Sequence, residues 1–222
     1  MTDEELSIDT TRGAVPALLL KPAMARWLLV LGHGAGAGMR HRFMNDIAHR
    51  LALRDLAVLR YEYPYVTAGS KRPDPAPILE SVTRQVVQYA AARHPDLRLA
   101  AGGKSMGGRM TSRAQSAESL ARVETLFFFG FPLHAAGRPG IERAAHLDDV
   151  RIPMLFLQGT RDALADLQLI REVTGRLGSR ATLHVVAGAD HGFAVLKRSG
   201  RTSDQVQDEL ADSLAAWLHA RA

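Results

Sequence analysis

Short, continuously apolar runs alternate with segments of helical periodicity along most of this chain, and this alternation limits the folds open to it. Trp27–Leu31 is apolar at every position, which is typical of a strand buried on both faces of a sheet. Arg42–Arg54 then places Phe43 and Leu51 on one helical face. Further strands are predicted at Leu56–Tyr61, Leu97–Gly102, Val123–Phe129, Ile152–Leu157 and Leu183–Val186, and further helices at Ile78–Arg93, Ser105–Ser116, Asp166–Leu177 and Ser203–Ala220. This order predicts an α/β fold with a mostly parallel central sheet and helices on both faces.

Two more strands at the start of the chain, Glu5–Asp9 and Ala14–Lys21, bring the predicted sheet to about eight strands. The longest irregular stretches are Pro64–Pro77 and Pro132–Arg151, the second with one helical turn. Neither is long enough to form a separate cap. We therefore expect residues 1–222 to form a single domain with little or no cap domain. Ser203 is predicted as the N-cap of the last helix.

The sequence Gly103-Lys104-Ser105-Met106-Gly107 has the form G-x-S-x-G, at the junction of a predicted strand and a predicted helix. A serine on such a sharp turn needs glycines beside it, because side chains there would collide with the neighbouring strand and helix. The turn raises the hydroxyl above the sheet and aims the helix N-terminus at the reacting oxygen. Ser105 is therefore predicted to be a catalytic nucleophile.

A serine nucleophile needs a base and an acid, which in this arrangement follow it in the order acid, then histidine. Asp162 lies just after the Ile152–Leu157 strand, and His191 just after the Leu183–Val186 strand. Both would lie at the carboxyl edge of the sheet, where open α/β sheets place their sites. Histidine suits a base near neutral pH, and Asp162 would hold its tautomer. Two rival acids are less suited: Asp190 adjoins His191 in sequence, and Asp166 is expected to cap a helix.

The oxyanion formed during acyl transfer needs two N–H donors. We expect one from the backbone of Met106 and the other from the loop after Trp27–Leu31, where Gly34 or Ala35 could supply it. Glycine in that loop allows the backbone to approach a substrate closely. The sequence leaves open which of the two residues donates.

Two glycine motifs suggest other functions. Gly32–Ala37 fits G-x-G-x-x-A, and Glu62 ends the next strand, which would indicate a dinucleotide-binding oxidoreductase. That interpretation leaves Ser105, Asp162 and His191 without roles. The Gly103-Lys104-Ser105 sequence resembles the end of a P-loop, but Arg98 stands where that motif needs glycine. The nine histidines show no H-E-x-x-H pattern, so we predict no metal and no cofactor.

The formal net charge of +5 comes almost entirely from arginines scattered singly along the chain. A nucleic-acid footprint would need clustered charge, so we expect no nucleic-acid partner. The absence of cysteine excludes disulfides and thiolate nucleophiles. Residues 1–10 lack the features of a signal peptide, and no apolar stretch could span a bilayer, so we expect a cytoplasmic protein without a membrane partner. The oligomeric state is not predicted.

The serine motif stands within a longer sequence that resembles the KANSL-like α/β-hydrolases, relatives of the dienelactone-hydrolase-type enzymes. The likeness rests on Ala101–Arg109, His33–Gly36, Leu59–Pro64, Gly130–His134 and Pro153–Asp162. The resemblance implies an α/β-hydrolase fold with Ser105, Asp162 and His191 as its triad. Dienelactone hydrolases use a cysteine nucleophile, which this chain lacks, so their activity is not implied. Some eukaryotic members of the group resemble scaffold subunits.

These observations predict an esterase or thioesterase that acts on a small acyl substrate through an acyl-enzyme. The alternative is a catalytically silent α/β-hydrolase-fold protein that binds a partner or serves as a scaffold. Basic residues follow several predicted strands, among them Arg40 and Arg72. Since guanidinium groups bind carboxylates and phosphates, we expect these two to hold an anionic substrate.

Overall fold

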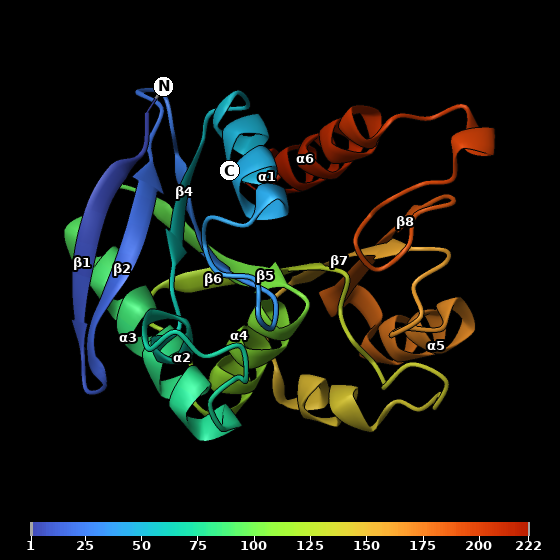
Figure 1. Cartoon of the computed structure of the whole chain (residues 1–222), viewed down its shortest axis with the longest axis horizontal. Coiled ribbons are helices and arrows are strands. Elements are labelled where there is room, and N and C mark those ends of the chain that lie inside the picture. Colours follow the sequence, from blue (N-terminus) through green and yellow to red (C-terminus); the bar gives the residue numbers. More distant parts are fainter. Residues whose placement is uncertain (1, 222) are drawn as a thin grey trace.

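The computed structural model describes residues 2–221 and contains one eight-stranded sheet (Figure 1). The strands are β1 (Glu4–Thr10), β2 (Gly13–Leu20), β3 (Trp27–Gly32), β4 (Leu56–Tyr61), β5 (Arg98–Lys104), β6 (Val123–Phe129), β7 (Met154–Gly159) and β8 (Ala181–Val186). Their order across the sheet is β1-β2-β4-β3-β5-β6-β7-β8. Strand β2 pairs antiparallel with both β1 and β4, and all other neighbouring strands pair parallel, which confirms the predicted fold class.

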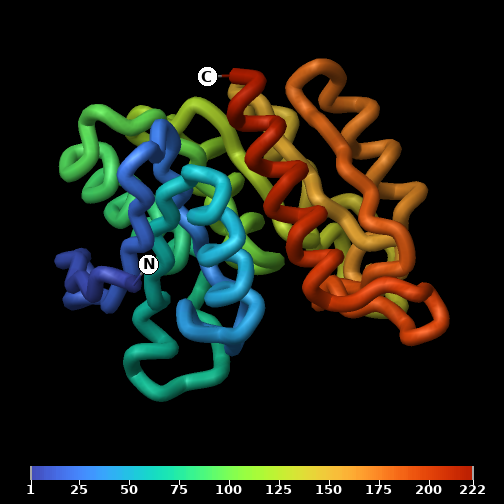
Figure 2. The backbone as a smooth tube through the Cα atoms, turned by 90° about the horizontal axis from the view of Figure 1, so that it is seen from above, coloured from blue at the N-terminus to red at the C-terminus, as the bar shows by residue number. Residues whose placement is uncertain are grey.

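The helices cover both faces of this sheet. They are α1 (Arg42–Ala52), α2 (Pro64–Thr67), α3 (Ala76–Arg93), α4 (Met106–Ala117), α5 (Leu167–Leu177) and α6 (Ser203–His219), with 3-10 segments η1 (Glu142–Asp149), η2 (Gly178–Arg180) and η3 (Lys197–Ser199). Helices α1 and α6 pack on one face, and α3, α4 and α5 on the other. Figure 2 shows α1 and α6 running next to each other.

Strand β3 shows why the apolar runs predict buried strands. Trp27, Leu29 and Leu31 belong to the cluster under α1 and α6, whereas Leu28 and Val30 belong to the cluster on the opposite face. Successive side chains of a strand point to opposite faces, so a strand covered on both sides must be apolar at every position. The β3 strand lies in the middle of the sheet, and its end faces the serine turn.

Several predicted boundaries need correction. Helix α6 is capped by Thr202 and not by Ser203, because the Thr202 side chain accepts from the Gln205 N–H and the Gln205 side chain accepts in return from the Thr202 N–H. Helix α3 begins two residues earlier than expected, at Ala76, after Pro75 at its N-cap. The stretches expected to be irregular contain α2 and the eight-residue η1, which is longer than the one turn predicted.

Candidate active site

Ser105 lies on the turn that joins β5 to α4 and has a strained backbone. Its φ of 50° and ψ of −113° place a non-glycine residue in a region that L-amino acids rarely occupy. The glycines beside it are required by space. A Cβ on either Gly103 or Gly107 would lie 2.3 Å from the carbonyl oxygen of Gly32, at the end of β3. The predicted steric reason for the two glycines is therefore present in the fold.

Ser105, His191 and Asp162 form one continuous chain of hydrogen bonds. The Oγ of Ser105 lies 2.9 Å from His191 Nε2, and His191 Nδ1 lies 2.8 Å from Asp162 Oδ2. This geometry assigns the Nδ1–H tautomer, with Nε2 free to accept the serine proton. The three side chains come from loops after β5, β8 and β7, all at the carboxyl edge of the sheet.

The Asp162 carboxylate is almost fully buried and is held by the protein on several sides. Its Oδ2 also accepts from Gln158 Nε2 at 2.5 Å, and its Oδ1 accepts from the Leu164 N–H at 2.8 Å. These bonds fix the carboxylate toward His191, as a triad requires.

The two rival acids make other bonds. Asp190 Oδ1 accepts from the N–H groups of Gly192 and Ala194, which shapes its own loop. Asp166 Oδ1 accepts from Gln168 and Leu169 and so caps α5. Of the three aspartates considered from the sequence, Asp162 alone contacts His191.

The residues predicted to supply the oxyanion donors lie beside Ser105. Met106 is the first residue of α4, so its N–H has no acceptor within the helix. In the loop after β3, the Gly36 N–H donates to the Tyr65 hydroxyl and the Ala37 N–H donates to the Gly34 carbonyl. Those two donors are already used. Gly34 and Ala35 both line the cavity next to Ser105, and the geometry leaves both as candidates.

His33, which the sequence analysis left without a role, holds this loop in place. Its fully buried ring lies 2.8 Å from the Gly34 carbonyl through Nδ1 and 3.2 Å from the Tyr63 N–H through Nε2. A neutral imidazole satisfies both bonds by donating from Nδ1 and accepting at Nε2. Burial lowers the pKa of His33 to about 4, which keeps the ring neutral. The His-Gly sequence after a buried strand was the available signal for this role.

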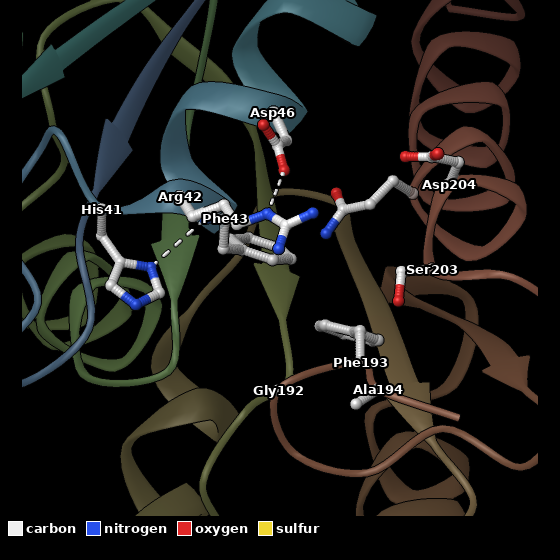
Figure 3. Close-up of a pocket in the computed structure, with 10 residues that line it drawn as sticks. His41, Arg42, Phe43, Asp46, Gly192, Phe193, Ala194, Ser203 and Asp204 are labelled. Atoms are coloured by element: carbon white, nitrogen blue, oxygen red, sulfur yellow. Dashed lines mark hydrogen bonds and ion pairs between the residues drawn. The ribbon is translucent and has the colours of Figure 1, made fainter. Parts of the chain in front are cut away.

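A cavity of about 320 Å³ opens beside Ser105. Its apolar lining includes Phe43, Met44 and Leu164, and its polar lining includes His41 and Lys104. A smaller hollow of about 180 Å³ adjoins it, and Phe43 lines both. Figure 3 shows residues that line this second hollow, among them Phe43 and Phe193, whose stacked rings have centroids 5.7 Å apart.

Arg40 and Arg72, the predicted substrate-binding residues, are not among the residues that line either hollow. Arg40 pairs with Glu5 at 2.5 Å on the surface. Arg72 is exposed in the loop between α2 and α3. The structure does not bring these two arginines together with Ser105, and their role in substrate binding stays a prediction.

The glycine loop after β3 also differs from a dinucleotide site. Helix α1 begins only at Arg42, so the loop does not lead directly into a helix N-terminus. The Glu62 carboxylate accepts from the Met39 N–H and lies 3.4 Å from His33, so it is engaged within the loop. Within residues 2–221 no group of three or more His, Asp or Glu side chains could hold a metal ion, and no helix there is long and apolar enough to cross a membrane.

The sequence model of the family described as an alpha/beta hydrolase domain matches residues 25–219. The chain therefore belongs to the α/β hydrolases. The predicted likeness to the KANSL-like group within that family is not tested by this match.

Solved structures share the fold over nearly the whole chain. A serine hydrolase without a lid from Xanthomonas campestris is 21% identical, with a TM-score of 0.76 over 98% of this chain and 95% of that one. An α/β serine hydrolase homologue from Coxiella burnetii is 19% identical, with a TM-score of 0.76 over 98% of each chain. A dienelactone hydrolase from Anabaena variabilis is 18% identical, with a TM-score of 0.76 over 99% of each chain. At these identities the likeness concerns the fold.

Proposed function

We propose that this protein is a serine hydrolase of the esterase or thioesterase type, which acts on a small acyl substrate through an acyl-enzyme. The observation that carries the proposal is the unbroken series of hydrogen bonds from Ser105 to His191 to Asp162 beside a cavity. An α/β-hydrolase fold alone would not distinguish an enzyme from a binding protein.

The geometry supports an acyl transfer in two halves. The Ser105 hydroxyl attacks the substrate carbonyl while His191 Nε2 takes its proton, and Asp162 stabilises the imidazolium that forms. The oxyanion accepts from the Met106 N–H and from the N–H of Gly34 or Ala35. His191 then protonates the leaving group as the tetrahedral intermediate collapses. Water, activated by the same histidine, attacks the acyl-enzyme and restores Ser105.

The cavity lining favours an uncharged, apolar acyl or leaving group. Phe43, Met44 and Leu164 offer apolar contact, and the nearest cation, Lys104, already donates to a backbone carbonyl. Apolar walls with a few polar groups are typical of small-molecule sites. We therefore propose that short neutral acyl esters or thioesters are better substrates than anionic ones, in place of the anionic substrate suggested by Arg40 and Arg72.

Labelling with a fluorophosphonate tests the proposal, because this reagent reacts with an activated serine. We expect a stoichiometric mass increase on the peptide that contains Ser105 in the wild type and in Ser116→Ala, and no increase in Ser105→Ala. Hydrolysis of p-nitrophenyl esters and acyl-CoA thioesters of increasing chain length then separates ester from thioester activity. A folded wild-type protein that neither labels nor hydrolyses any of these would favour the silent binding or scaffold role instead.

A further inference from the structure

Lys104 occupies the variable position of the G-x-S-x-G sequence, and the proposed mechanism gives it no role. It is the last residue of β5, next to Ser105, and only 9% of its surface is exposed. Burying an ammonium group is costly unless the protein supplies partners for it. Burial of Lys104 is therefore unfavourable by itself, and the partners of its ammonium group indicate which role offsets this free-energy cost.

The ammonium group of Lys104 contacts the loop that carries His191. Its Nζ donates a 2.6 Å hydrogen bond to the main-chain carbonyl of His191. The same atom lies 5.3 Å from the ring centroid of Phe193 and 5.8 Å from that of Phe43, within the range of cation–π attraction. His191 is thus held at two points: Lys104 holds its backbone, and Asp162 holds its ring.

The space around this contact is shared with the triad. A Cβ on Gly130, in the loop after β6, would lie 3.1 Å from Lys104 Nζ and 3.5 Å from both Asp162 Oδ2 and His191 Nδ1. Gly130 has a φ of 68° and leaves room for all three groups. The ammonium, the carboxylate and the imidazole therefore surround one glycine, at distances where each charge affects the others.

Three further titratable groups lie near the Lys104–His191 contact. Asp162 and Asp190 are the anions whose charges act on Lys104. His41, from the loop before α1, lines the same cavity as Lys104 and His191. Desolvation lowers the pKa of Lys104 to about 8, so the group still carries its positive charge at neutral and acidic pH.

We propose that Lys104 is a positioning residue for His191: its Nζ ties the His191 backbone to the end of β5, and its positive charge opposes protonation of the imidazole. The charge counters part of the attraction that Asp162 exerts on an imidazolium. The consequence of Lys104 for hydrolysis rests on the proposed function, whereas the effect of Lys104 on the titration of His191 does not.

Proton NMR of the His191 imidazole across pH tests the charge effect without any substrate. We expect Lys104→Met to move the midpoint of the His191 titration upward by about one pH unit, as loss of a neighbouring like charge does. Lys104→Arg keeps the charge and should leave the midpoint near that of the wild type. The matched control is Lys21→Met, which removes the same charge from an exposed residue after β2, near the opposite edge of the sheet. It should not move the midpoint.

Kinetics separate positioning from a general loss of structure. We expect the acid limb of kcat/KM to move upward with the NMR midpoint in Lys104→Met and to return in Lys104→Arg, while KM changes less than kcat. A role in stability alone would lower activity without moving the limb, and that result would overturn the proposal. An unchanged NMR midpoint in Lys104→Met would overturn it as well.

Two further readouts keep the test decisive. If Lys104→Met does not fold, the wild-type His191 resonance should show a second, smaller step near pH 8, as Lys104 loses its proton, and this step should be absent in Lys104→Arg. Its presence in both proteins, or in neither, would contradict the proposal. If the wild type hydrolyses nothing but the NMR shifts occur, the proposed function fails and the positioning of His191 by Lys104 stands.

Discussion

The two loops on either side of Ser105 are each held by a buried basic side chain, but the two side chains differ in charge. The loop after β3 is held by His33, which is neutral because burial lowers its pKa to about 4. The loop after β8 is held by Lys104, whose pKa of about 8 leaves it charged at neutral pH. A neutral group suits the loop that we propose offers free N–H donors to the oxyanion, since it only fixes backbone geometry. A charged group beside the histidine also changes the equilibrium of that base.

A buried basic side chain that bonds to a backbone carbonyl can thus have two functions. His33 satisfies its own two nitrogens within the protein, at Gly34 and Tyr63. Lys104 makes one hydrogen bond to His191, and aromatic faces and nearby carboxylates compensate the rest of its charge. His33 therefore only fixes the backbone of the loop after β3. Lys104 fixes the backbone of the loop after β8 and also places a positive charge beside His191.

The largest expected effect comes from the serine between the two loops. Ser105→Ala removes the proposed nucleophile and should lower kcat for ester hydrolysis by about 10⁶-fold, as loss of a triad serine does. The fold should survive, because the side chain is small and lies at the cavity; circular dichroism and thermal unfolding check this. Residual activity above a few per cent of wild type would show that Ser105 is not the nucleophile. The loops after β3 and β8 would then not lie on either side of the reacting atom.

The next effect tests which acid serves the second loop. Asp162→Asn should lower kcat by about 10⁴-fold, because an amide at this position no longer selects the Nδ1–H tautomer of His191. Asp190→Asn should lower it only a few-fold, since Asp190 bonds to the N–H groups of its own loop. Steady-state kinetics on one ester decide the ranking, and the reverse order would show that the hydrogen bond to Asp162 is not the functional one.

A third prediction concerns stability in acid and tests the neutral state of His33. Its pKa is about 4 in the folded protein, against an ordinary value of 6.5, so between these values the unfolded state binds more protons. The stabilisation is complete above pH 6.5 and is lost as the pH falls toward 4. Its size is roughly 3 kcal/mol, at about 1.4 kcal/mol for each unit of pKa shift.

Urea unfolding at pH 7 and pH 4.5, in the wild type and in His33→Asn, measures this contribution. The variant should be less stable at pH 7 but should lose less stability between the two pH values, because asparagine does not titrate. His146→Asn serves as the comparison for the second histidine whose pKa burial lowers to about 4. Equal losses in the wild type and in His33→Asn would mean that folding does not lower the pKa of His33.

The last prediction concerns stability in alkali, where an effect of similar size but at the other end of the pH range tests the lowered pKa of Lys104. Its pKa falls from 10.5 to about 8 on folding, so the unfolded state binds more protons between these values. The contribution of this group to stability therefore rises as the pH increases from about 8 to about 10.5. In Lys104→Met that rise should be missing, which urea unfolding at pH 7.5 and pH 10 would detect. An identical pH dependence in the two proteins would mean that folding does not lower the pKa of Lys104.

Much of the fold could be predicted from the sequence because each local signal had one physical interpretation. Fully apolar runs such as Trp27–Leu31 can be strands only where both faces are covered. The errors lie at element ends and in the two stretches expected to be irregular, which contain α2 and η1. The N-cap of α6 is Thr202 instead of the predicted Ser203, because the capping box depends on which of two neighbouring hydroxyls lies next to Gln205. Such one-residue choices depend on backbone angles that composition does not fix.

The candidate site could also be predicted only in part from the sequence. Ser105, Asp162 and His191 could be selected from the sequence because strand ends of a parallel sheet converge at one edge. That Asp190 bonds within its own loop, and that Arg40 pairs with Glu5 away from the cavity, could not be derived. Those outcomes depend on side-chain directions in three dimensions.

The order of strands and helices, the glycines that the serine turn requires and the three residues proposed for chemistry all follow from the amino-acid sequence. These features are local, or follow from the rule that parallel strands share an edge. The tertiary structure alone decided the roles of His33 and Lys104. Each is buried against atoms more than twenty positions away in the chain, at Tyr63 for one and at His191 for the other. A buried basic side chain acquires its charge state and its partner only when folding excludes water around it.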